Sequence, residues 1–222
     1  MIKAICFDLD GTLAHYQGDF RALGRAVFQT LAVPTDHFET ASAAFSKHVR
    51  SEGVSTLPII LRGIAQDLGS TSINTRHLKL AADTMTADYA AEMALLPGAK
   101  EVLELVQHLP LALVSNGPSD MQRAALRKMG LESFFTAIVI SGDEDVAVRK
   151  PNPRIFELAC ERLNAPPEHV LMVGDNLEAD IRGALAAGLQ AVWLGEDEVE
   201  GVETVGSPKE LHAYLRAKTF VN

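Results

Sequence analysis

The stretch that decides the fold is Ile2-Lys3-Ala4-Ile5-Cys6-Phe7-Asp8-Leu9-Asp10-Gly11-Thr12, in which a short apolar run stops at two aspartates and a glycine. A nearly continuous apolar run of this length, bounded by a polar turn, predicts a buried strand over residues 2–7. Four further apolar runs end in polar or glycine residues in the same way: 111–114, 137–140, 170–173 and 190–194. We therefore expect five strands.

Helical patterns lie between these runs. Residues 119–129 are closed by Gly130 and begin at Ser119, which we expect to cap the helix, and residues 153–163 open with a proline. Strands that alternate with helices predict a doubly wound, parallel, Rossmann-like sheet of five strands. Right-handed crossovers bring the carboxyl ends of such strands to one edge, where ligands bind.

The stretch after the first strand breaks this alternation. Between residues 14 and 94 we find four helical patterns and no convincing strand: 19–32, 35–52, 57–68 and 74–93. We predict two domains, a Rossmann-like catalytic core (residues 1–13 and 95–222) and an inserted all-helical cap (residues 14–94) over the ligand edge of the sheet. The acidic tract 196–203 is interpreted as a solvated loop.

Composition narrows the function classes. The chain has 222 residues, of which 47% are hydrophobic and 22% charged, as in an ordinary globular protein. Its net charge of −9 argues against nucleic-acid partners and against a basic membrane-binding surface. No apolar run approaches a membrane span and no signal-peptide pattern is present, so we expect a cytoplasmic protein with Cys6 and Cys160 reduced and buried.

Asp8 and Asp10 are the first residues that could carry chemistry. Two carboxylates at the end of one strand repel each other, and proteins tolerate this where a divalent cation lies between them or one holds a proton. Gly11 gives the backbone freedom to bend sharply beside a ligand. Aspartates of an ordinary Asp-Gly turn are the structural alternative.

The other strand ends supply complementary groups. Ser115 and Asn116 offer a hydroxyl, an amide and backbone N–H groups before a helix, which suit phosphate oxygens. Lys150 precedes a proline that stiffens its loop, and Asp175 and Asp180 add carboxylates after another strand. Positioning and charge stabilisation by groups of these kinds are what phosphoryl transfer needs.

Together these residues resemble the four motifs of the haloacid dehalogenase superfamily, most of whose members are phosphatases. The motifs occur in order as Asp8-Leu9-Asp10-Gly11-Thr12, Ser115, Lys150, and Gly174-Asp175 with Asp180. The helical insert after the first motif resembles the subfamily with a helical-bundle cap, the C1 type. Four residues rather than three separate Asp175 from Asp180, a spacing that the family also accepts.

The resemblance implies a role for each of these residues. Asp8 would be the nucleophile that becomes an aspartyl phosphate, Asp10 the general acid and base, and Lys150 a catalytic cation. The implied contacts to the substrate phosphate are Leu9, Ser115, Asn116 and Lys150. The implied Mg²⁺ ligands are Asp8, Asp10 through its backbone carbonyl, and Asp175, with Asp180 orienting them. Asn176 is a further candidate contact to the metal.

We therefore expect a Mg²⁺-dependent phosphomonoesterase that acts on a small phosphorylated metabolite. A sugar phosphomutase using the same site remains open as the alternative. Asp10 disfavours a haloacid dehalogenase, because halide leaves without a proton. The presence of all four motifs disfavours a non-catalytic binding module, and the lysines that phosphonate cleavage would require in the cap, Lys47 or Lys79, have no supporting motif.

The cap is expected to select the substrate. His15, Arg21 and Arg25 follow closely behind the first motif and are candidates for contacting a second polar group of the substrate, as is Arg62 further along. A solvated helix face is the alternative for each of them. The seven histidines lack the clustered spacing of a zinc site. The sequence leaves open which phosphorylated metabolite is used and the oligomeric state.

Overall fold

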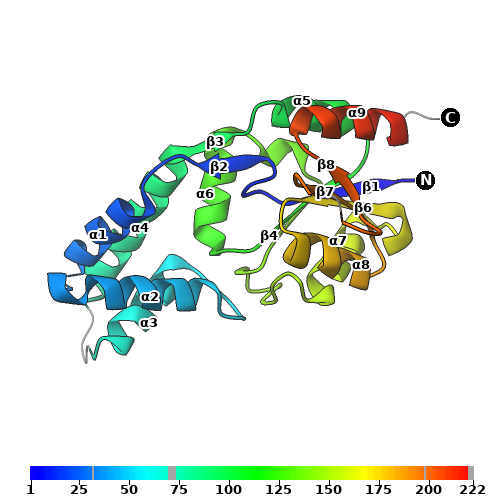
Figure 1. Ribbon diagram of the computed structural model, residues 1–222. Helices are drawn as coiled ribbons and strands as arrows, with labels where there is room; N and C mark the ends of the chain where they lie inside the picture. Colours follow the sequence, from blue (N-terminus) through cyan, green and yellow to red (C-terminus); the bar gives the residue numbers. More distant parts are fainter. Residues whose placement is uncertain (32, 70–73, 198, 220–222) are drawn as a thin grey trace.

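The computed structural model describes residues 1–31, 33–69, 74–197 and 199–219. Its centre is a six-stranded parallel sheet with the strand order β5-β4-β1-β6-β7-β8 (Figure 1). The bounds are β1 Ala4–Phe7, β4 Leu111–Ser115, β5 Ala137–Ile140, β6 Val170–Gly174, β7 Gln190–Leu194 and β8 Glu203–Val205. The predicted α/β class is confirmed, and the five predicted strands are all present.

Helices cover both faces of this sheet. On one face Ile5 and Phe7 pack with residues from three helices, which are α5 (Ala99–Val106), α6 (Ser119–Met129) and α9 (Pro208–Thr219). On the other face Ala4 and Cys6 pack with α7 (Pro153–Leu163) and α8 (Gly183–Ala186). Successive strand residues point to opposite faces, so a strand covered on both sides must be apolar throughout. The strand order reverses beside β1, where open α/β sheets bind ligands.

Two details of the core differ from the predictions. The sheet has a sixth strand, because Glu203, the last residue of the acidic tract that was expected to be a loop, forms β8 with the two residues after it and pairs with β7. The mixed polarity of this short edge strand concealed it, since only Val205 is buried. The second difference is that Ser119 is the first residue of α6 and not its cap, which is Pro118; the Ser119 hydroxyl donates to the Asp143 carboxylate.

The insert, residues 14–94, contains the four predicted helices and is called the cap below. The helices are α1 (Phe20–Thr30), α2 (Phe38–Val49), α3 (Leu57–Asp67) and α4 (Thr75–Glu92), with a 3₁₀ turn, η1 (Thr35–His37), before α2. The predicted helix end at residue 32 lies outside the described residues. Two short antiparallel strands that the sequence did not indicate, β2 (Ala14–Tyr16) and β3 (Met93–Leu95), lead into and out of the cap. Strands of three residues are too short to produce a recognisable alternation.

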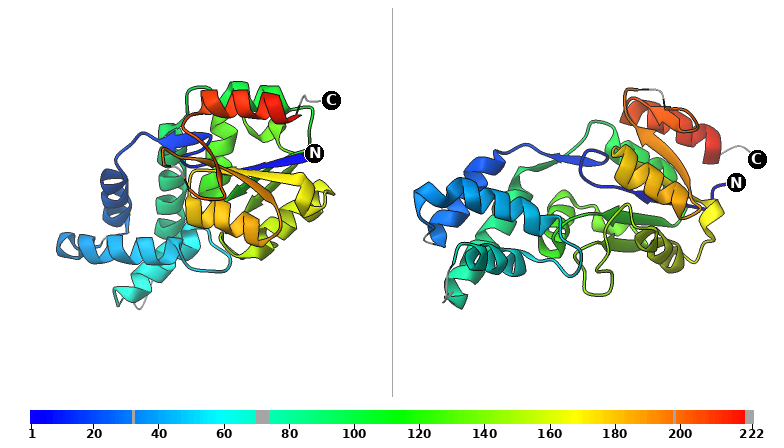
Figure 2. Two further views of the ribbon diagram at one scale, coloured as in Figure 1. Left: turned by 45° about the vertical axis from the view of Figure 1, so that its right-hand side comes forward. Right: turned by 60° about the horizontal axis from the view of Figure 1, so that its bottom comes forward.

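The cap lies beyond the carboxyl ends of the sheet strands, and the N-terminus and helix α9 lie toward the opposite end of the molecule (Figures 1 and 2). Buried apolar side chains of α1–α4 join those of α5, α6 and α9 in one cluster. The division at residues 13/14 and 94/95 therefore remains a prediction. Cys6 and Cys160 are buried free thiols, as expected. Among the described residues, no helix is both long enough and apolar enough to cross a bilayer.

Candidate active site

The carboxyl ends of β1, β4 and β6 meet because these strands are neighbours in the sheet. Asp8 follows β1, Ser115 is the last residue of β4, and Asp175 follows β6. Asp180 lies in η4 (Leu177–Arg182), a π-helical turn that the Asn176 side chain caps. The strand order thus gathers side chains that are distant in the sequence at the edge below the cap.

Lys150 reaches into this cluster from the loop before α7. Its ammonium lies 2.5 Å from a carboxylate oxygen of Asp8 and 2.6 Å from one of Asp180, and it donates to the carbonyl of Val114 at 2.7 Å. Burial disfavours the charged lysine, but the two carboxylates outweigh burial and hold the pKa of Lys150 above its ordinary value. Lys150 is therefore a fixed cation beside Asp8.

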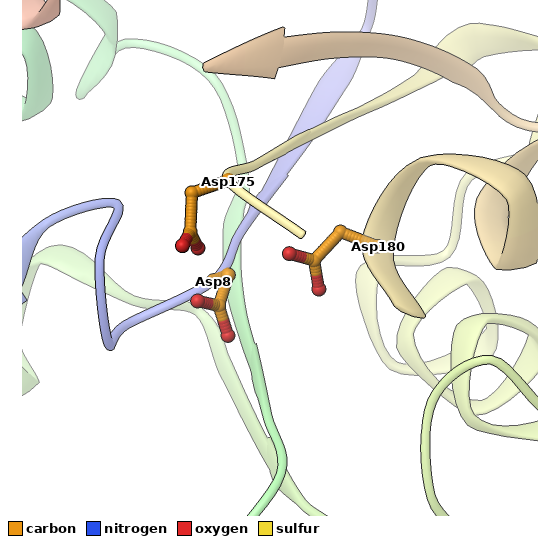
Figure 3. Close-up of side chains that lie close together, drawn as sticks. All are labelled: Asp8, Asp175 and Asp180. Carbon is orange, nitrogen blue, oxygen red and sulfur yellow. The ribbon is translucent and has the colours of Figure 1, made fainter. Parts of the chain in front are cut away.

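Oxygens of Asp8, Asp175 and Asp180 lie within 4.8 Å of one another, and the three side chains converge from β1, the end of β6 and η4 (Figure 3). Burial raises the pKa of Asp8 and of Asp175, and the charge on Asp180 raises both further. Three carboxylates against one ammonium leave an excess of negative charge. Oxygen donors with such an excess fit Mg²⁺, which takes carboxylates, carbonyls and water.

The neighbours of these carboxylates hold them in place. Thr12 donates to Asp175 at 3.1 Å, and the Trp193 indole donates to the backbone carbonyl of Asp175 at 2.7 Å. A side chain at Gly11 would come within 2.2 Å of the Asp175 carboxylate, and the φ angle there is +89°. Glycine at position 11 is therefore required both by the backbone and by the space that Asp175 occupies.

The Asp10 side chain is not part of the three-carboxylate cluster. It accepts hydrogen bonds from Tyr89 of α4 at 3.1 Å and from Gln122 of α6 at 2.9 Å. Burial raises the pKa of Asp10, while these two hydrogen bonds act in the opposite direction. A carboxyl group with a raised pKa can hold a proton closer to neutral pH, as a general acid must.

The residues predicted to contact the phosphate differ in whether their polar groups are already hydrogen-bonded. The Ser115 hydroxyl is buried and has no hydrogen-bond partner among the described residues, so it can bind a ligand oxygen. The Asn116 amide is already engaged, because it donates to the carbonyl of Lys150 at 3.0 Å and accepts from its N–H at 2.9 Å. Asn116 thus positions Lys150. Leu9 is fully buried, and its contact with a phosphate stays a prediction.

Beside Asp10 a cavity of about 370 Å³ opens between the core and the cap. His15 lines it, whereas Arg21 and Arg25 line an adjoining cavity of about 200 Å³ within the cap, which shares Phe20 and Phe45 with it. Of the three candidates near the first motif, His15 is the one placed beside Asp10, and a contact between any of them and the substrate stays a prediction. Lys47 and Lys79 pair with Asp67 and Asp83 on the cap surface.

Sequence reasoning missed two groups that contact the site, Tyr89 and Gln122. Each lies within a helix and has no local motif, and only the packing of α4 and α6 brings them to Asp10. Spacing along the chain could not have identified them, because Tyr89 and Gln122 lie 79 and 112 residues from Asp10 in the sequence.

Comparison with known proteins places this geometry in a family. A model of haloacid dehalogenase-like hydrolases matches residues 2–188. The chain belongs to this hydrolase family. Among solved structures of the family's fold, a 2-haloacid dehalogenase from Pseudomonas syringae superposes with a TM-score of 0.71 at 22% identity, covering 98% of this chain and 100% of that one. A magnesium-bound HAD-hydrolase from Bacillus subtilis, YfnB, gives a TM-score of 0.68 at 24% identity over 97% and 99%.

Relatives found by sequence carry phosphatase names. Ribulose-1,5-bisphosphate 5-phosphatase of Halopiger xanaduensis is 33% identical over 89% of this chain and 87% of its own length. Glyceraldehyde 3-phosphate phosphatase of Methanopyrus kandleri is 31% identical over 91% and 88%. Pyrimidine 5'-nucleotidase YjjG of Escherichia coli is 38% identical, but the match spans 53% of each chain.

Proposed function

We propose that this hydrolase is a Mg²⁺-dependent phosphomonoesterase that acts on small phosphorylated metabolites through an aspartyl phosphate on Asp8. One observation carries the proposal. Asp8 is buried directly after β1, with a carboxylate oxygen on Lys150 and within a cluster of aspartates. The neighbouring strand β4 ends at Ser115, whose hydroxyl has no hydrogen-bond partner among the described residues. This arrangement combines an anionic nucleophile with groups that bind phosphate oxygens.

The proposed reaction has two halves. A carboxylate oxygen of Asp8 attacks phosphorus, the bond from phosphorus to the alcohol oxygen breaks, and Asp10 gives its proton to that oxygen. Water then attacks the phosphorus of the aspartyl phosphate while Asp10 takes a proton from the water, which releases inorganic phosphate and restores Asp8. The raised pKa of Asp10 supports this dual role, because the group must change protonation state in each cycle.

The remaining residues stabilise charge and fix positions. Lys150 and Ser115 would bind the equatorial oxygens of the phosphoryl group, and Asp180 and Asn116 hold Lys150 in position. The carboxylates of Asp8 and Asp175 with the backbone carbonyl of Asp10 would hold Mg²⁺. The bound ion would neutralise the crowded negative charge, so that an anionic phosphate can approach an anionic nucleophile.

Two relatives that match most of this chain support a small phosphorylated metabolite as the substrate, since their names specify a sugar bisphosphate and a triose phosphate. The first test is the release of inorganic phosphate from p-nitrophenyl phosphate, with Mg²⁺ and after chelation. We expect release only with the metal. A phosphomutase would instead convert a hexose 1-phosphate to its isomer without releasing phosphate, and a complete lack of release from any phosphate ester would contradict the proposal.

A further inference from the structure

The cavity beside Asp10 is where the alcohol part of a phosphate ester must lie while Asp8 attacks phosphorus, because Asp10 has to reach the leaving oxygen. Its walls come from both parts of the molecule: Asn116 to Pro118, Met121 and Gln122 from the core, and β2, α1, α2 and α4 from the cap. Its volume of about 370 Å³ is near the lower end for small-molecule sites.

The cap side of this cavity is aromatic. Tyr16, Phe20, Phe45 and Tyr89 line it, from β2, α1, α2 and α4. Tyr16 lies against Phe20 with ring centroids 4.1 Å apart, and it stacks on Tyr89 at 5.4 Å with 14° between the planes. Phe20 is 56% exposed, although phenylalanine side chains are most often buried. Its ring is therefore available to a ligand.

The same cavity has no lysine or arginine among its described lining residues. Its ionisable side chains are Asp10, His15, Tyr16 and Tyr89, and His15 shares a hydrogen bond with Gln17. Burial, together with the carboxylates of Glu92, Asp19 and Asp88, raises the pKa of Tyr16. Arg21 and Arg25 line the other cavity, which shares only Phe20 and Phe45 with this one.

We propose that this cavity selects phosphate monoesters of an uncharged alcohol that carries a flat ring, the chemistry of a nucleoside monophosphate, and rejects esters with a second anionic group. The inference rests on the proposed function and specifies its substrate class. A flat ring gains stacking on Phe20 and Tyr16, whereas a second phosphate or a carboxylate would find neither a lysine nor an arginine among the described residues of the cavity wall. Phe20 is then a specificity-determining residue.

The experiment compares kcat/KM for four esters with Mg²⁺ present: uridine 5'-monophosphate, glycerol 3-phosphate, ribulose 1,5-bisphosphate and phosphoserine. We expect the nucleotide to exceed the bisphosphate and phosphoserine at least about tenfold, as stacking and charge exclusion act together. p-Nitrophenyl phosphate is included as a reference for the chemical step itself.

Two variants separate stacking from general damage. Phe20→Ala should raise KM for uridine 5'-monophosphate about tenfold, with kcat and the glycerol 3-phosphate parameters within about twofold. Leu80→Ala is the matched control, because Leu80 is equally exposed at 56% on α4 but does not line this cavity. Val49→Lys, which adds a cation to the cavity wall, should raise kcat/KM for ribulose 1,5-bisphosphate severalfold.

The outcomes distinguish the two levels of the proposal. Turnover of p-nitrophenyl phosphate combined with equal or better use of the bisphosphate or phosphoserine would overturn the inference and leave the proposed function standing. A loss of activity toward the bisphosphate or phosphoserine in Arg21→Ala or Arg25→Ala would have the same meaning. It would show that the second anionic group of these esters binds in the cavity lined by the two arginines. No turnover of any ester would overturn both.

Discussion

The end of the sheet and the cap contribute to the site by different physical means. At the sheet, Asp8, Ser115 and Asp175 stand at or directly after the ends of three adjacent strands, and Lys150 is fixed among them by ion pairs. In the cap, the groups that face the cavity are side chains of helices and of a short strand, such as Phe20 and Tyr89, whose positions depend on how these elements pack.

The strand ends are thus expected to carry out phosphoryl transfer, and the cap is expected to select the substrate. The groups for phosphoryl transfer are buried and charged, and breaking an ion pair among them is costly, so their geometry is rigid. The groups expected to contact the rest of the substrate are aromatic and partly exposed, and they can be exchanged without disturbing the sheet. Changes at the strand ends should therefore affect kcat for every substrate, whereas changes in the cap should affect some substrates only.

The largest effect is expected for Asp8→Asn. An amide cannot act as the nucleophile, so kcat should fall by at least about 10⁴-fold for all esters. Circular dichroism and thermal unfolding should show an intact fold. Asp83→Asn, an exposed aspartate paired with Lys79 on the cap, serves as the control and should retain activity. Substantial turnover by the purified Asp8→Asn protein would contradict its assignment.

Asp10→Asn is expected to lower kcat by about 10²- to 10⁴-fold, because the leaving oxygen and the attacking water lose their proton donor and acceptor. The loss should be smaller for p-nitrophenyl phosphate than for an alkyl phosphate, since p-nitrophenolate leaves readily without a proton. Rapid-quench measurements with both esters test this. Equal losses would argue against Asp10 as the acid.

Tyr89→Phe tests the hydrogen bond from the cap to Asp10. Removing the hydroxyl should lower kcat about tenfold, the equivalent of one hydrogen bond to a charged group at about 1.5 kcal/mol, with KM little changed. Tyr214→Phe on α9 is a matched control, being a half-buried tyrosine far from the site. If KM rose while kcat held, Tyr89 would instead belong to the substrate-binding wall.

The smallest effect concerns the contact between cap and core at Asp120, whose carboxylate accepts the Leu57 N–H at the start of α3 at 2.9 Å. Asp120→Ala should cost about 1–2 kcal/mol of unfolding free energy, because that N–H loses its acceptor. Burial raises the pKa of Asp120, so ionisation costs the wild type stability as pH rises above the ordinary aspartate value.

The deficit of the Asp120→Ala variant should therefore shrink between about pH 4 and about pH 7. Urea unfolding of both proteins at the two pH values measures it, with the exposed Asp145→Ala as the control. A deficit that grows with pH would show that the ionised carboxylate stabilises the fold.

The sequence predicted the residues at the ends of the sheet strands better than those on the helices. Apolar runs that end in Asp8, Ser115 and Asp175 could be read directly, because each lies within one short segment and parallel topology brings strand ends together. β8 was missed because only Val205 of its three residues is buried. Tyr89 and Gln122 could not be found because helical periodicity shows which face is buried, but not which neighbour that face meets.

The cap residues show the same limit. Proximity in sequence to the first motif suggested His15, Arg21 and Arg25 equally, yet β2 directs His15 to the cavity beside Asp10, while α1 carries the two arginines to the other cavity. The hydrogen bonds between the Asn116 amide and the backbone of Lys150 were likewise not indicated by the sequence. Such choices depend on tertiary contacts that spacing does not encode.

The central claim is that Asp8 carries the phosphoryl group. A crystal structure of the protein soaked with Mg²⁺ and beryllium trifluoride, a mimic of a phosphoryl group on a carboxylate, tests it most directly. The account predicts beryllium bonded to a carboxylate oxygen of Asp8, fluorines in contact with Lys150 and Ser115, and the metal beside Asp175. An adduct on another side chain, with Asp8 still paired to Lys150 and unmodified, would contradict it.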